Sequence, residues 1–100
     1  MLGTLYVVIS SEKEEDYQMI KEQLLAINPH FSISPYKEST MTRNASEFFV
    51  TFQIKKEDIQ ELLDKPNNDW DGEYDDCIAC GFNTKMFDSL IYHLAFQLYE

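Results

Sequence analysis

Glycine, proline and cysteine are all scarce in this chain, with three, three and two residues among 100. So few glycines leave no glycine-rich phosphate-binding loop, and two cysteines three residues apart cannot cross-link a small secreted scaffold. No apolar run approaches the roughly 18 residues that a membrane-spanning helix needs. The short run Leu5–Ile9 also lacks the basic flank and the length of a secretory signal. We therefore expect a cytoplasmic protein. A hydrophobic content of 44% is too high for disorder, so residues 1–100 should form one folded domain.

Basic residues are also few: 8 Lys and Arg stand against 18 Asp and Glu, which gives a formal net charge of −10. Nucleic acids and anionic membranes should repel such a chain, so we expect it to bind neither directly. The charge is concentrated between positions 57 and 76, where Lys65 is the single base among nine carboxylates: Glu57, Asp58, Glu61, Asp64, Asp69, Asp71, Glu73, Asp75 and Asp76. Crowded acids destabilise a compact domain through self-repulsion, so this cluster suggests a function.

The hydrophobic pattern predicts an α+β domain. The expected elements are strands over 4–9, 31–34, 48–54 and, more weakly, 74–80, with helices over about 11–27, 56–64 and 83–99. A capping-box pattern over 11–14 should begin the first helix, and Asn28-Pro29 should end it. The order β-α-β-β-α-(β)-α indicates a small, mostly antiparallel sheet of three or four strands packed with three helices. A ferredoxin-like sheet with an added C-terminal helix is one possible topology.

Two segments should build most of the core. In the strand over 48–54, alternate apolar residues (Phe48, Val50, Phe52 and Ile54) should share one face. In the final helix, helical spacing places Met86, Phe87, Leu90, Ile91, Leu94 and Leu98 on one stripe, which we expect to pack against that strand. Tyr92, Phe96 and Tyr99 fall on the opposite side of this helix. They should either pack inside the domain or form a secondary partner-binding patch.

Neither possible metal site is complete. The segment 67–78 matches the ligand spacing of an EF-hand calcium loop through the ninth position. The matching residues are Asn67, Asp69, Asp71, Gly72, Glu73 and Asp75. The twelfth position, where calcium needs a bidentate Glu, is Ile78. The pair Cys77 and Cys80 has only the distant His30 and His93 to complete a zinc site. Asp75 and Asp76 should also raise the pKa of Cys77, so we expect inert thiols, no metal and no cofactor.

No catalytic residue is predicted. No Ser or Cys near His93 forms a recognisable nucleophile motif, and carboxylate pairs are too numerous here to mark a hydrolytic site. We therefore expect a protein that is not an enzyme.

The acidic segment is better interpreted as a contact surface for a basic protein. Trp and Tyr are enriched at interface hot spots, and carboxylates around them can pair with Lys or Arg of a partner. The predicted partner-binding residues are Asp64, Asp69, Trp70, Asp71, Glu73, Tyr74, Asp75 and Asp76. The alternative is a solvated acidic loop that keeps the protein soluble, with Trp70 folded back onto the core.

In its overall character, a small acidic domain with aromatics among clustered carboxylates, the chain resembles bacterial toxin-immunity proteins of the contact-dependent growth inhibition class. The resemblance implies a protein that binds and neutralises a basic toxin domain, such as a nuclease, by covering its active site. One alternative is a DNA mimic that inhibits a DNA-binding host protein. A metal-binding or enzymatic domain is another.

Overall fold

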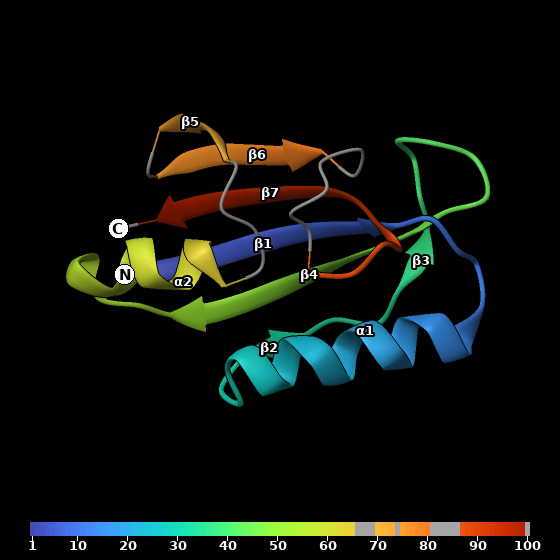
Figure 1. Cartoon of the computed structure of the whole chain (residues 1–100), viewed down its shortest axis with the longest axis horizontal. Helices are drawn as coiled ribbons and strands as arrows, with labels where there is room; N and C mark the ends of the chain where they lie inside the picture. The colour runs from blue at the N-terminus through green and yellow to red at the C-terminus, as the bar shows by residue number, and fades with distance from the viewer. Residues whose placement is uncertain (66–69, 74, 81–86, 100) are drawn as a thin grey trace.

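The computed structural model describes residues 1–65, 70–73, 75–80 and 87–99, with the backbone only at 79 and 80. Its elements, in chain order, are β1 (Leu2–Ile9), α1 (Glu14–Ile27), β2 (Ser32–Ile33), β3 (Lys37–Glu38), β4 (Ser46–Gln53), the 3₁₀ turn η1 (Lys56–Asp58), α2 (Ile59–Asp64), β5 (Asp71–Glu73), β6 (Asp76–Cys80) and β7 (Ile91–Tyr99). All strands join one antiparallel sheet in the order β2-β4-β1-β7-β6-β5, and β3 also pairs with β4. Figure 1 shows β1 in the middle of this sheet, α1 beside β2 and β4, and α2 near the chain termini.

The core lies between one face of the sheet and the two helices. Every second residue of the long strands points into it, because successive strand side chains alternate between faces. Its buried members include Leu5, Val7 and Ile9 of β1, Phe48, Val50 and Phe52 of β4, Leu94 and Phe96 of β7, Tyr17, Ile20 and Leu24 of α1, and Ile59 and Leu63 of α2. The predicted common core of the segments 48–54 and 90–98 is confirmed, since Ile54, Leu90 and Leu98 pack against the same cluster.

The predicted C-terminal helix is wrong: Ile91–Tyr99 forms strand β7, which pairs with β1 along its whole length. The register of this pair shifts between Val8 and Ile9, where the partner residue changes from His93 to Ile91. Because of this irregularity, Ile91 and Leu94 both enter the core although they are three residues apart. In the sequence, these two residues therefore have the three-residue spacing of side chains on one face of a helix.

The expected sheet of three or four strands with three helices is also wrong, because the described residues form seven strands and two α-helices. Two strands arise in segments expected to be loops: β3 follows Tyr36, and β5 lies within the acidic segment. The first helix is confirmed, but the capping box does not form. Instead, Ser11 Oγ donates a hydrogen bond to Asp16 Oδ2 (2.5 Å) and accepts one from the amide of Lys13 (3.1 Å).

Candidate partner-binding surface

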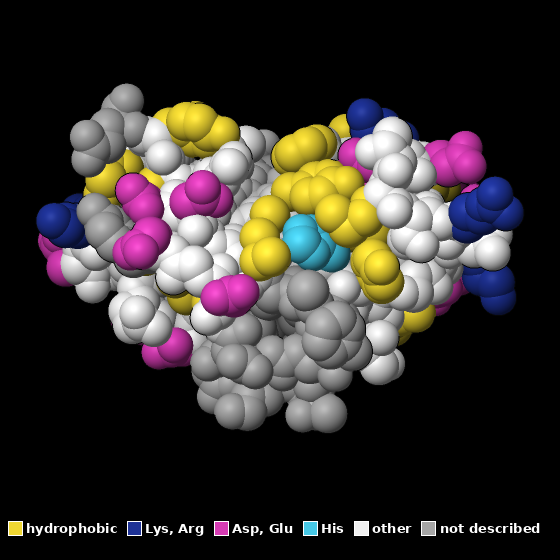
Figure 2. Space-filling view, turned by 90° about the horizontal axis from the view of Figure 1, so that it is seen from above, with side chains coloured by type: hydrophobic (Ala, Val, Ile, Leu, Met, Phe, Trp, Pro, Cys, Tyr) yellow, Lys and Arg dark blue, Asp and Glu magenta, His cyan; other side chains and the backbone are white. Residues whose placement is uncertain are grey.

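The acidic segment folds into two adjacent elements, η1–α2 and the β5–β6 hairpin. Eight of its carboxylates lie in the described residues, and all eight are exposed: Glu57, Asp58, Glu61, Asp64, Asp71, Glu73, Asp75 and Asp76. We call these eight residues the acidic surface. Lys55, Lys56 and Lys65 flank it, so eight negative charges face three positive ones. Figure 2 shows several acidic side chains gathered toward one end of the molecule.

The hairpin holds like charges close together. Glu73 of β5 is directly opposite Asp76 of β6, and like charges in this position destabilise a sheet. The close approach of the two strands depends on Gly72, whose φ is +123°. A Cβ atom at this position would lie 2.5 Å from the carbonyl oxygen of Asp76. The local sequence therefore favours a tight hairpin despite its charge repulsion.

The carboxylates of the acidic surface are largely unused by the fold. Across the described part of the chain, the one side-chain hydrogen bond that the surface makes runs from Gln60 Nε2 to Asp64 Oδ1, at 3.0 Å. This contact lies within a single exposed turn of α2. The remaining carboxylates can therefore exchange water for Lys or Arg of another protein without breaking a described internal contact.

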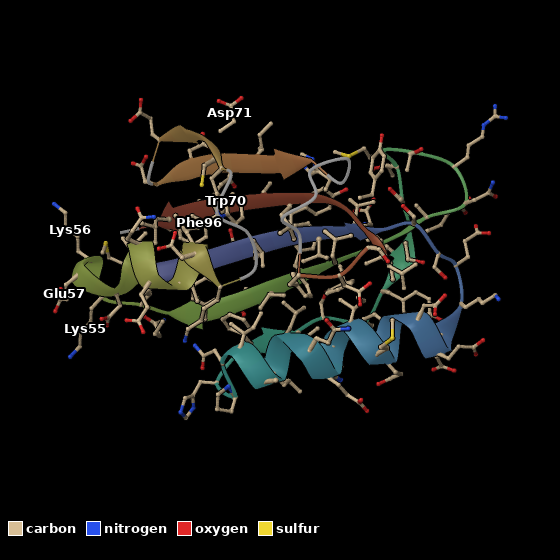
Figure 3. The ribbon with its side chains drawn as sticks, viewed as in Figure 1. Lys55, Lys56, Glu57, Trp70, Asp71 and Phe96 are labelled. Atoms are coloured by element: carbon tan, nitrogen blue, oxygen red, sulfur yellow. The ribbon has the colours of Figure 1, made fainter. Side chains whose placement is uncertain are left out.

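Trp70 connects the hairpin to the core. Its indole Nε1 donates a 2.7 Å hydrogen bond to the carbonyl oxygen of Leu63 at the end of α2. The ring is half-buried and lines a small apolar space with Leu63 and Phe96. Figure 3 shows Phe96 beside Trp70. Trp70 thus packs against the core, as the alternative interpretation of the sequence expected of this residue, and it holds the hairpin in place. Asp71 points away from the helices (Figure 3).

The other predicted contact residues are separated by the fold. Phe96 is 1% exposed and belongs to the core, whereas Tyr92 and Tyr99 are exposed. The secondary patch of these three residues is therefore not present, because the strand directs Phe96 into the core. Asp69 and Tyr74 lie outside the described residues.

The sequence did not reveal an apolar patch on the second face of the sheet, which neither helix covers. Its members are Tyr6, Phe49, Ile78, His93 and Ala95, and we call it the open-face patch. The ring centroids of Tyr6 and Phe49 lie 5.1 Å apart, and those of Tyr6 and His93 lie 6.2 Å apart. Burial lowers the pKa of His93, which favours its neutral form. Figure 2 shows hydrophobic side chains gathered around a histidine.

A buried carboxylate borders this patch. Glu47 is 4% exposed, and its Oε1 accepts hydrogen bonds from the amide (2.7 Å) and hydroxyl (3.2 Å) of Thr40. The backbone hydrogen bond from Thr40 lowers the pKa of Glu47, and burial together with the nearby Glu47 raises the pKa of Tyr6. Glu47 is thus an ionised anchor for the loop after β3. Its hydrogen bonds fit this structural role rather than that of a catalytic base.

Cys77 has the properties of a structural thiol. It is buried on the core face of β6. Its pKa is raised to about 11, chiefly by burial and then by Asp76 and Asp75. The predicted effect of these neighbours is confirmed for this thiol. Among the described residues, no group of three or more His, Cys, Asp or Glu is arranged to hold a metal ion. Asn67 and Asp69 of the EF-hand-like rhythm are outside that part of the chain.

No helix in the described parts of the chain is long and apolar enough to cross a membrane. No family model, curated protein sequence or solved structure matches this chain. The site must therefore be interpreted from its own geometry and charge.

Proposed function

We propose that this protein is a non-enzymatic immunity protein that binds a basic protein partner, such as a nuclease toxin domain, and covers its active site. The main support is the acidic surface, whose eight described carboxylates are all exposed. Clustered charge of one sign attracts a partner of the opposite sign and raises the rate of association. Nuclease domains are basic because they hold phosphates, so an acidic inhibitor complements them directly.

The cost of the acidic surface to the fold also supports the proposal. Glu73 and Asp76 repel each other across the hairpin. Trp70 nevertheless holds this hairpin to α2 through the Leu63 carbonyl. A binding surface gains from such preorganised charge, because the carboxylates are already in place when the partner arrives.

The direct test uses a candidate toxin. If a neighbouring gene encodes a large secreted protein with a variable C-terminal domain, that domain is purified in a catalytically inactive form. Isothermal titration calorimetry then measures its affinity for this protein at low and at physiological salt. We expect a complex that weakens as salt rises, because the Debye length falls to about 8–10 Å. Co-expression with the active domain should protect cells. Absence of both binding and protection would contradict the proposal.

Charge variants locate the contact. Asp71→Asn combined with Asp76→Asn should weaken the complex about 30-fold or more, since breaking a buried charge pair costs about 2–5 kcal/mol. The matched control, Glu22→Gln with Glu38→Gln, changes the net charge equally at exposed positions outside the acidic surface. Equal losses in both double variants would show that net charge matters but that this surface does not.

A further inference from the structure

We propose that the open-face patch is the centre of the partner contact and that the acidic surface forms one border of it. The inference rests on the proposed function and specifies where the partner docks. The partner would be a folded basic protein that presents an apolar surface bordered on one side by Lys or Arg.

The sheet register places the patch and the carboxylates in continuous rows. Phe49 of β4 is opposite Tyr6 of β1, Tyr6 is opposite Ala95 of β7, Ala95 is opposite Ile78 of β6, and Ile78 is opposite Asp71 of β5. One apolar row therefore crosses four strands and ends at a carboxylate. Directly opposite residues of adjacent strands point to the same face, so these side chains share one surface.

The next row is likewise uncharged on β4, β1 and β7, and it carries two carboxylates on β6 and β5. It contains Thr51, Thr4, Gln97, Asp76 and Glu73, in the order β4, β1, β7, β6 and β5. Apart from the buried Glu47 of β4, the face that neither helix covers is thus uncharged across β4, β1 and β7 and acidic at its β5–β6 edge. A basic partner is complementary to that edge, whereas a second copy of the chain is itself acidic, with a net charge of −10.

The neutral part of the face has the composition of an interface centre. Phe49 is 45% exposed and Ile78 is 40% exposed, although both lie on strands whose other face is well packed. Solvated faces of antiparallel sheets usually carry polar side chains. Aromatic and aliphatic residues in the middle of a contact supply much of its binding energy, while charges at the border guide association.

The test uses a synthetic probe, so it does not depend on finding the toxin. A 12-residue peptide that alternates Arg with Tyr and Leu is titrated into ¹⁵N-labelled protein, and amide chemical shifts are followed by NMR. Two matched peptides serve as controls: one alternates Arg with Ser, and the other alternates Glu with Tyr and Leu. We expect the largest shifts at Tyr6, Phe49, Ile78 and Ala95, and weaker binding of both control peptides.

Variants then separate the patch from the charge. Phe49→Ser and Ile78→Ser should each weaken binding of the Arg-Tyr-Leu peptide roughly fivefold or more. Met19→Ser on α1 is the matched control, because this side chain is 39% exposed and lies on a helix that packs against the opposite face. Circular dichroism checks that each variant is folded.

Three results would overturn the inference. The first is a Phe49→Ser variant that binds the Arg-Tyr-Leu peptide as tightly as the wild type, with chemical-shift changes confined to α2 and the hairpin. This result would leave the charge-based proposed function intact. The second is failure of the Arg-Tyr-Leu peptide to bind at all. The third is a dimer of the free protein in sedimentation equilibrium that Phe49→Ser dissociates, since this would assign the face to a second copy. Failure of the proposed function is recognised separately, by a toxin domain that neither binds nor is neutralised.

Discussion

Replacing Gly3 with alanine should destabilise the protein by about 1–3 kcal/mol, the range for overpacking a well-filled core. Gly3 lies in β1, directly opposite Phe52 of β4 and Leu98 of β7. A Cβ atom at Gly3 would lie 2.7 Å from Cζ of the Phe52 ring and still closer to its Cε2. Ordinary carbon contacts need about 3.5–4.0 Å, so the ring or the strand must move.

The Phe52 ring has little room to move. Its centroid lies 5.0 Å from that of Phe31 and 6.1 Å from that of Phe96, with which it is stacked. Displacing it would disturb both contacts in the buried core. With a urea dependence of about 1–3 kcal/mol per M, the unfolding midpoint should fall by roughly 1 M.

Urea unfolding followed by circular dichroism measures this effect. Thr4→Ala is the control, because this neighbouring side chain points to the opposite face. Combining Gly3→Ala with Phe52→Leu should recover about 1 kcal/mol relative to the sum of the single variants, because the smaller side chain makes room. In an unconstrained strand, alanine would stabilise the protein by roughly 0.5–1 kcal/mol. A neutral or stabilising Gly3→Ala would therefore refute the close approach of Gly3 and Phe52.

Three further predictions concern buried or half-buried side chains. Leu94→Ala should cost about 2–5 kcal/mol in urea melts, because Leu94 is fully buried in β7; a loss below roughly 0.5 kcal/mol would make this strand peripheral. Stability should fall as pH drops below 6.5 and again below 4.5, since the pKa values of His93 and Glu47 are lower in the folded protein than in the unfolded chain. His93→Gln should flatten the first step and Glu47→Gln the second, and unchanged pH profiles would contradict this assignment. In a Cys80→Ser background, Cys77 should react slowly with Ellman's reagent until urea unfolds the protein, because its pKa is about 11; rapid reaction of the folded protein would show an accessible thiolate.

The first helix and the strand over 46–53 could be predicted because their patterns are regular. The last strand could not, because the register shift beside Val8 gives Ile91 and Leu94 the spacing of a helix. A second feature pointed to the correct structure. Tyr92, Phe96 and Tyr99 made the supposed helix apolar on two sides, and the segment is rich in aromatic residues, which favour strands.

The acidic surface could be located from the sequence because its carboxylates are close together in the chain. The sequence could not show which residues of this segment are free to contact a partner and which hold the fold together. Trp70 and Asp71 are adjacent in sequence, yet Trp70 holds the hairpin to Leu63 while Asp71 is exposed. Only the fold separates the residue that positions the surface from the residue that a partner can contact.

The open-face patch is a different case, because Tyr6, Phe49, Ile78 and Ala95 come from four strands that are distant in sequence. Charge attraction by the acidic surface needs little more than its local sequence, so it should persist in a partly unfolded chain. The patch exists only when β4, β1, β7 and β6 are aligned in register. Salt should therefore weaken mainly the contribution of the acidic surface, whereas variants that disturb the sheet should remove that of the patch. A partner that uses both would bind the folded protein far more tightly than charge alone allows.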